Sequence, residues 1–342
     1  MIQRIQQLPR GQRILIFVLF LVGILLFAGA VTLGVILLIF NTSQREQGAA
    51  LIEGITVTEW VQLPDDDAYP ATVAVSPDGT VYTASYVSGV IWQISPEGNV
   101  TEIPNTRDQI GAVTGLALGA DGTIYALDRL TSDFRSQGGI IWRVTPDGSV
   151  SEFGEIDDSS GFVSPDDLTL DGGGNLYVSD RGRRDVWRFT SEGVGALWWV
   201  VPPDTNDGAR VIPTGLAYDA STDTIIITDS ETDQIFRVSL DGQTTEVLFM
   251  LDAGQTPANL DGVTVAPDGT IYVAALGANR VSRFESGALT ALASGFRGAS
   301  DVAINGTRLY VTNFDQRSLA PPPGLQPRLP FALDVLELAP EN

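Results

Sequence analysis

The sequence contains no cysteine, no histidine and no lysine, so all 20 of its basic residues are arginine. The absence of histidine and cysteine excludes Ser-His-Asp and Cys-His nucleophile systems, His-ligated zinc and thiolate metal sites. It also excludes disulfide bonds, so the fold must be held together by its packed core. Any catalysis would have to use carboxylates, Arg, Tyr, Ser or Thr, or a cation bound through oxygen, such as calcium or magnesium.

Acidic residues outnumber the arginines, with 42 Asp and Glu and a formal net charge of −22. All of the acids lie after residue 41. A domain of this charge is a poor partner for nucleic acid or an anionic lipid surface, whereas metal cations, basic proteins and neutral sugars suit it better. We therefore expect no nucleic-acid partner. A simpler interpretation of the charge is that it keeps an extracellular domain soluble.

A stretch without any charge spans residues 14–40, with the sequence ILIFVLFLVGILLFAGAVTLGVILLIF. It is longer than the roughly 20 residues that a helix needs to cross the hydrocarbon core. Arg4, Arg10 and Arg13 precede it, and few charges follow it directly. The positive-inside rule then predicts a single-pass membrane protein with its N-terminus in the cytoplasm and the remainder outside, at the cell surface or in a periplasm-like space.

A cleavable signal peptide is the alternative interpretation of this segment. Ala28, Gly29 and Ala30 supply the small residues of a cleavage site after a short apolar stretch. Ten more residues of membrane-grade sequence follow, at positions 31–40. This extra length favours an uncleaved signal-anchor.

Internal repeats dominate the rest of the chain. A short apolar strand, a Gly- or Asp-rich turn and a second β-rich strand recur six times, as ATVAVSPDGTVYTAS, TGLALGADGTIYALD, DDLTLDGGGNLYVSD, TGLAYDASTDTIIITDS, DGVTVAPDGTIYVAA and SDVAINGTRLYVTN. In most copies a third strand and a more polar fourth strand follow. Four antiparallel strands repeated every roughly 40 to 50 residues are typical of propeller blades. The sequence therefore predicts an all-β, six-bladed propeller of four-stranded blades, preceded by one transmembrane helix.

Two details support a closed ring. The central residues of the first strands are small, as strands converging on a propeller axis require: Ala74, Ala117, Thr169, Ala217, Thr264 and Ala303. The sixth repeat lacks a fourth strand, whereas GITVTEWVQL, just after the apolar segment, has no blade of its own. Pairing this strand with the late FALDVLEL strand would close the ring and remove both edges. The predicted division is a cytoplasmic segment 1–13, a transmembrane helix 14–40, a linker 41–53, a propeller 54–338 and a tail 339–342.

These repeats resemble the NHL-repeat and gluconolactonase-like group of six-bladed propellers, also known as the senescence-marker-protein family, and more loosely the strictosidine-synthase-like proteins. The likeness covers residues 54–338 and rests on the recurring strand pair and on hairpins such as IIWRVTPDG. It implies a propeller fold more specifically than it implies a chemistry. The group contains calcium- or zinc-dependent lactonases, other hydrolases and members that only bind a partner.

In the lactonase members, a metal lies at the mouth of the axial channel, held by residues at the starts of inner strands. The corresponding positions here are Ala71, Thr114, Asp166, Thr214, Asp261 and Ser300. The resemblance implies a Glu ligand in blade one, an Asn in blade four and an Asp in blade five. Only Asp261 matches, because Ala71 cannot bind a metal and Thr214 is a poor replacement.

A rearranged cation site, with calcium as the expected ion, would use Asp166, Asp167 and Asp261, with Asp301 nearby. The first two occupy the place of an Asn-Asp pair that lies beside substrate and metal in the lactonases. Carboxylates around a channel suit a hard cation, although waters would supply several of its ligands. The simpler interpretation is that each Asp binds backbone amides at the start of its strand.

Structural roles are expected for two further sets of repeated residues. One set ends the second strands and is expected to satisfy turn amides: Asp128, Asp180, Asp229 and Asn313. The other is expected to pack within the framework: Trp92, Trp142 and Trp187. Outside the repeat, Trp198 and Trp199 are candidates for an exposed binding patch. The insertions 131–139 and 321–330 add loops to the channel-mouth face, where we expect partner specificity.

Two functions compete at this stage. The first is a non-catalytic binding or scaffolding module outside the membrane, which engages a protein, a saccharide or a larger membrane assembly through the loop-rich face. The incomplete metal constellation and the lack of histidine favour it. The second is a metal-dependent lactonase- or esterase-like hydrolase, in which a cation held by Asp166, Asp167 and Asp261 polarises a carbonyl and activates water.

Overall fold

The structure is a computed structural model that describes residues 9–42, 47–130, 138–156, 161–201, 210–252, 254–319 and 326–339. The chain divides into two compact units. One contains helix α2 (Arg10–Thr42), and the other contains every strand that the structure describes.

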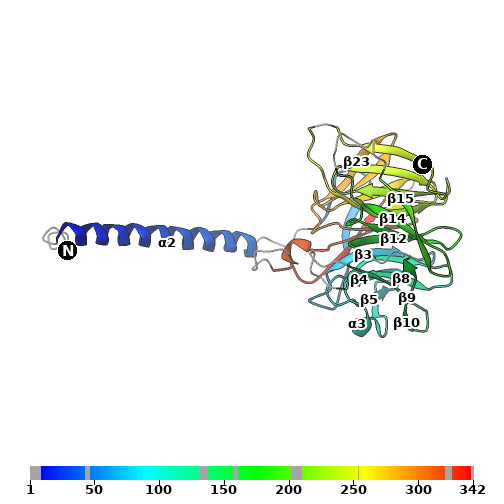
Figure 1. The fold of residues 1–342 in the computed structure, drawn as a ribbon, viewed down its shortest axis with the longest axis horizontal. Coiled ribbons are helices and arrows are strands. Elements are labelled where there is room, and N and C mark those ends of the chain that lie inside the picture. Colours follow the sequence, from blue (N-terminus) through cyan, green and yellow to red (C-terminus); the bar gives the residue numbers. More distant parts are fainter. Residues whose placement is uncertain are drawn as a thin grey trace. The chain divides into compact units, whose positions relative to one another are not determined.

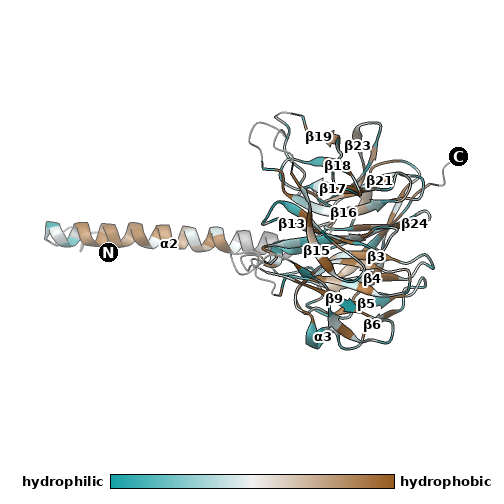
Figure 2. Cartoon of the chain, turned by 45° about the vertical axis from the view of Figure 1, so that its right-hand side comes forward, coloured by the Kyte–Doolittle hydropathy of each residue, from teal (hydrophilic) through white to brown (hydrophobic). Residues whose placement is uncertain are grey.

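Helix α2 is apolar on all sides, as Figure 2 shows by the brown colour along much of its length. Its large apolar side chains are exposed from Ile14 to Leu33. A helix that is hydrophobic all round requires an apolar environment. By length and composition α2 is able to cross a membrane, a property that it shares with a signal sequence.

The second unit is a six-bladed β-propeller (Figure 1). Each blade begins with an inner strand: β3 (Pro70–Val75), β7 (Val113–Leu118), β12 (Pro165–Leu170), β16 (Pro213–Asp219), β20 (Leu260–Val265) and β24 (Val302–Asn305). The second strands are β4 (Val81–Ser85), β8 (Ile124–Asp128), β13 (Leu176–Asp180), β17 (Thr224–Asp229), β21 (Ile271–Ala275) and β25 (Arg308–Thr312). Each inner strand lies beside the inner strand of the next blade, and β24 lies beside β3.

Third and fourth strands complete the blades. The third strands are β5 (Ile91–Ile94), β9 (Ile140–Val144), β14 (Asp185–Phe189), β18 (Gln234–Ser239), β22 (Arg280–Glu285) and β26 (Ala332–Glu337). The outer strands are β6 (Val100–Glu102), β10 (Val150–Glu152), β15 (Val194–Val200), β19 (Thr245–Met250), β23 (Ala288–Ser294) and β2 (Thr56–Gln62). Short helical turns occur at α3 (Thr106–Gln109) and η1 (Gln316–Leu319).

The ring closes as the sequence predicts. Strand β2, which precedes all of the blades, pairs antiparallel with β26, which is nearly the last part of the chain. The sixth sheet is therefore ordered β2-β26-β25-β24. Two additions were not expected: β1 (Ala49–Ala50) lies antiparallel beside β23, and β11 (Glu155–Ile156) lies parallel to β15. Each makes its sheet five-stranded.

The core lies between neighbouring sheets, where side chains of adjacent blades interdigitate. Between blades two and three, for example, Ala117 and Leu127 belong to the same buried cluster as Trp187 and Phe189. The repeated tryptophans pack as expected, with Trp92 fully buried and Trp187 nearly so. These clusters bury the apolar faces of the sheets, and this burial is the main stabilising term for a domain without disulfides.

The patch expected at Trp198 and Trp199 is wrong. Trp199 is buried, donates from its indole nitrogen to Thr245 Oγ1 and packs against Phe236. Trp198 is half-buried and donates to the Leu240 carbonyl. Both side chains therefore join blade three to blade four, because the large rings fill the space between two sheets rather than facing solvent.

Candidate functional site

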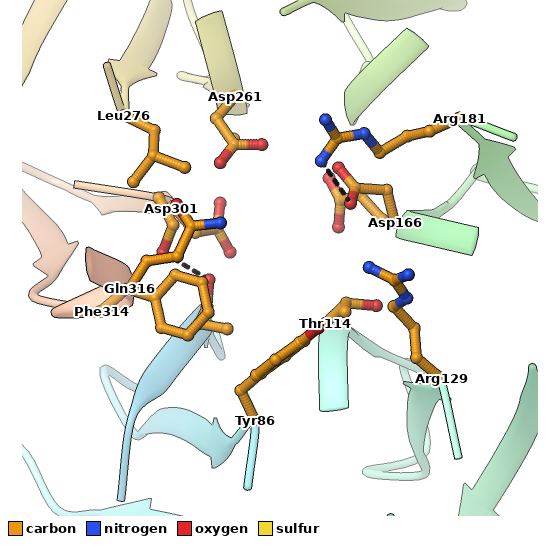
Figure 3. Close-up of a pocket in the computed structure, with 14 residues that line it drawn as sticks. Tyr86, Thr114, Arg129, Asp166, Arg181, Asp261, Leu276, Asp301, Phe314 and Gln316 are labelled. Carbon is orange, nitrogen blue, oxygen red and sulfur yellow. Dashed lines mark hydrogen bonds and ion pairs between the residues drawn. The ribbon is translucent and has the colours of Figure 1, made fainter. Parts of the chain in front are cut away.

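A pocket opens where the inner strands converge, and two positions of the repeat supply most of its lining (Figure 3). The first position is the start of the inner strand, which contributes Ala71, Thr114, Asp166, Asp261 and Ser300. The second follows the second strand, directly in the case of Tyr86, Arg129, Arg181 and Leu276 and two residues after the strand end in the case of Phe314. Asp167, Gly262, Asp301 and Gln316 complete the lining. About 490 Å³ inside the pocket and its mouth is free of protein atoms, and this volume includes the open solvent at the mouth.

The pocket is strongly asymmetric. Arg129 and Arg181, from blades two and three, form one side, and Tyr86, Leu276 and Phe314, from blades one, five and six, form the other (Figure 3). This arrangement follows from the repeat itself, because the residue at this position varies from blade to blade. One half carries both guanidinium groups, with Asp166 beside Arg181, and the other half carries the apolar side chains.

Asp301 holds blade six against blade one. One of its carboxylate oxygens accepts hydrogen bonds from Val73 N at 2.8 Å and Thr72 Oγ1 at 3.0 Å, and the other accepts from Val302 N at 2.8 Å. Burial and the Asp166 carboxylate raise the pKa of Asp301 to about 7, against the opposing effect of these donors. Its carboxylate is therefore fully engaged within the ring.

Asp167 performs the same task between blades three and four. It accepts from Leu216 N of the next blade at 2.8 Å and from Leu168 N of its own strand at 2.8 Å. Burial and the charge of Asp301 raise its pKa well above the usual range. The simpler interpretation, that these two aspartates bind backbone amides at strand starts, is confirmed for both and extends across the blade boundary.

The remaining acidic side chains of the pocket differ in their partners. Asp166 forms an ion pair with Arg181, with Nη1 3.3 Å from Oδ1. The Asp261 carboxyl has no hydrogen bond or ion pair among the described residues. Burial and the nearby Asp166 carboxylate raise the pKa of Asp261 well above its usual value, whereas Arg181 opposes this effect. A protonated Asp261 is able to donate a hydrogen bond into the pocket.

The other predicted positions are neutral. Ser300 lines the pocket but donates to the Ala71 carbonyl at 2.7 Å. Thr214 is fully buried, donates to the Leu260 carbonyl at 3.1 Å and is not part of the lining. Blade four therefore contributes neither of its two repeated positions to the pocket.

The residues that end the second strands bind backbone amides, as expected. Asp180 accepts from four backbone N–H groups, including those of Val163 at 2.7 Å and Ser164 at 2.8 Å. Asp128 and Asp229 bind loop amides in the same way, and Asn313 accepts from Arg297 N. These side chains hold the loops from which the pocket residues project. Most of the two predicted insertions, at residues 131–137 and 320–325, lies outside the described part of the chain.

Comparison with known proteins agrees with this architecture. Residues 205–314 match the model of the SMP-30/Gluconolactonase/LRE-like region. This part of the six-bladed propeller is thus similar to the gluconolactonase-like family. A search of curated proteins finds no significant match.

Several solved structures share the propeller fold at low identity. A gluconolactonase from Xanthomonas campestris is 16% identical, with 86% of this chain and 95% of that chain covered and a TM-score of 0.58. A catalytically inactive virginiamycin B lyase from Staphylococcus aureus with quinupristin is 17% identical, with 83% and 99% covered and a TM-score of 0.58. The PQQ-bound aldose sugar dehydrogenase from Streptomyces coelicolor is 15% identical, with 86% and 99% covered and a TM-score of 0.55. Such likenesses establish the fold alone.

The mouth of the propeller does not fit a calcium ion. In the part of the chain that the structure describes, no three acidic side chains are placed to hold a metal. Asp167 is engaged by backbone amides, Asp166 is paired with Arg181, and Arg129 adds a second positive charge to the same pocket. A hard cation needs six or more oxygen ligands and is repelled by neighbouring guanidinium groups. The metal site predicted from Asp166, Asp167 and Asp261 stays a prediction that this geometry does not favour.

Sequence reasoning missed the two arginines and the apolar wall. A signal was present, because one position of the sequence repeat, just past the second strand, holds Tyr86, Arg129, Arg181, Ser230, Leu276 and Phe314. The preceding strand end is a recognisable Asp, Asn or small residue in each blade. Aligning the repeats at that position would have brought these side chains to one face.

Proposed function

We propose that this chain is a membrane-anchored, non-catalytic binding module that displays its propeller outside the membrane and takes a small ligand at the mouth of the ring. One observation carries the proposal: three of the four carboxylates at the mouth are already engaged by backbone amides or by Arg181. A hydrolase of the metal-dependent kind needs free oxygen ligands at that place. A protein or saccharide partner on this face, expected from the sequence, stays a prediction.

The proposed binding function and the metal-dependent alternative predict opposite results for metal content and for hydrolysis. We expect the full chain, purified in detergent without chelators, to contain calcium and other metals well below one equivalent. We also expect no turnover of lactones or aryl esters with or without added calcium, because the guanidinium groups exclude a cation. Metal content by mass spectrometry and hydrolysis assays check both. Stoichiometric metal that Asp261→Asn removes together with turnover would contradict the proposal.

The absence of cysteine offers a clean test of the proposed anchor at residues 14–40. A single thiol introduced by Ser191→Cys, on an exposed turn of blade three, is expected to react with a membrane-impermeant maleimide in intact cells or spheroplasts. The matched Gln6→Cys variant should react only after lysis, because the positive-inside rule keeps its segment in the cytoplasm. Recovery of the labelled propeller in the soluble fraction would instead indicate a cleaved signal peptide.

A further inference from the structure

Arg129 is the unusual residue of the pocket. Only 6% of its surface is exposed, and among the described residues its guanidinium has no hydrogen bond or ion pair. Arg297 is equally buried, yet it pairs with Asp315 at 2.6 Å and donates to the Arg328 carbonyl. Arg181 has Asp166 as its partner. Arg129 therefore faces the pocket without a direct hydrogen-bond or ion-pair partner among the described residues.

A buried charge without a partner is costly, because it loses its hydration and gains nothing in return. The cost falls when an anion binds, and a planar carboxylate matches the guanidinium fork through two parallel hydrogen bonds. The side chain points toward the interior of the pocket from the end of β8 (Figure 3). The missing partner of Arg129 is thus expected on a ligand.

The opposite side of the pocket defines the rest of that ligand. Tyr86 and Phe314 lie edge to face, with ring centroids 5.2 Å apart, and Leu276 extends the same apolar surface (Figure 3). Most of the surface of Tyr86 and Phe314 is already buried, so an apolar ligand body would meet the small exposed parts of these rings and the half-buried Leu276. A short sugar acid, which is hydroxylated on every carbon, would leave this wall unused.

The acidic residues limit the charge of the ligand. Asp166, Asp261 and Asp301 all line the same pocket, and the propeller as a whole is strongly acidic. A dianion such as a phosphate monoester would be repelled by Asp166 and by the acidic propeller as a whole more strongly than a monoanion. Asp261, which has no partner among the described residues, is left to contact a polar atom of the ligand.

We infer that the pocket binds a small monoanion with an apolar or aromatic body, an arylcarboxylate for example, whose carboxylate pairs with Arg129 and whose body lies against Tyr86, Leu276 and Phe314. This inference rests on the proposed binding function and gives the chemical class of its ligand.

Phenylacetate is the probe for the test, titrated into the full chain in detergent micelles by isothermal titration calorimetry. Four probes serve as comparisons: 2-phenylethanol lacks the charge, phenethylamine reverses it, phenyl phosphate doubles it and acetate lacks the ring. We expect phenylacetate to bind at least about tenfold more tightly than each of them, since a tenfold preference needs only about 1.4 kcal/mol.

Variants assign the binding to the pocket. Arg129→Gln is expected to weaken phenylacetate binding at least about thirtyfold, as loss of one partner of a buried charge pair does. Arg143→Gln, on the exposed face of β9, is the matched control and should leave binding unchanged. Leu276→Ser tests the apolar wall independently and should also weaken binding. The melting temperature of Arg129→Gln is expected to equal or exceed that of the wild type, because the substitution removes a buried charge without a direct partner.

Several results would overturn the inference. One is that phenylacetate does not bind the wild type at millimolar concentration. Another is that 2-phenylethanol binds as tightly as phenylacetate, and a third is that Arg129→Gln binds phenylacetate with wild-type affinity. If Arg129→Gln does not fold, the relative affinities of the wild type for the five probes and the phenylacetate affinity of Leu276→Ser still test the inference. If the wild-type protein contains no metal, hydrolyses no substrate and binds phenethylamine more tightly than phenylacetate, this inference alone is wrong. If it contains stoichiometric metal and shows turnover, the proposed function is wrong.

Discussion

Removing the last ten residues, 333–342, is expected to unfold the entire propeller rather than one blade. The deletion takes away nearly all of β26, which pairs with β25 on one side and with β2 on the other. It also removes the buried side chains of Leu333, Val335 and Leu336. Two sheet edges would open, and the ring would lose its closure. The expected loss is the whole free energy of folding, typically about 5–15 kcal/mol.

Circular dichroism and thermal melts of the truncated chain check this prediction. A shorter truncation, of residues 340–342, is the matched control and should melt like the wild type, because β26 ends at Glu337. A ten-residue truncation that still melts cooperatively at an undiminished temperature would show that β2 and β26 are not needed for closure.

The repeats predicted this closure because propeller geometry leaves few alternatives. A sixth repeat with only three strands, together with an unassigned strand near residue 56, can satisfy both edges in a single way, and β2 pairs with β26 over six positions. The positions of β1 and β11 could not be predicted in this manner. Each is two residues long, and its pairing depends on tertiary contacts with β23 or β15 rather than on any periodicity.

The candidate site was predicted only in part for a different reason. The starts of inner strands gave Asp166, Asp167 and Asp261, but the sequence does not state which carboxylates are already bound. Leu216 N reaches Asp167 from the next blade, 49 residues away in the chain. The role of each Asp is thus decided by contacts between blades, which a single repeat does not reveal.

The same repeat position explains how one fold serves unlike ligands. Just past the second strand, this position supplies Tyr86, Arg129, Arg181, Leu276 and Phe314 to the pocket. None of these residues lies within a strand of the sheets. The chemistry of the mouth is therefore free to vary while the architecture stays constant.

Gly262→Ala is expected to destabilise the propeller by about 3 kcal/mol or more, which is large for the addition of one methyl group. A Cβ at this position would lie 2.6 Å from the Cα of Asp301 and 2.7 Å from the Ser300 carbonyl oxygen. Neither group is able to retreat, because Gly262 N already donates to that carbonyl at 2.8 Å and three donors fix the Asp301 carboxylate. The inner strands of blades five and six would have to separate.

Gly173→Ala is the matched control for this substitution. Gly173 lies in a turn of blade three, and its added Cβ would meet only side-chain atoms of Asn175 and Asp171, both at 3.3 Å. These contacts are much longer than the 2.6 Å approach to backbone at Gly262 and need a shift of only a few tenths of an ångström, so we expect a loss well below that of Gly262→Ala. Urea denaturation of both variants measures the difference. Of these two glycines, only Gly262 faces the backbone of the neighbouring blade. Equal stability of Gly262→Ala and Gly173→Ala would therefore contradict the prediction that the close approach of β20 to blade six stabilises the contact between these blades.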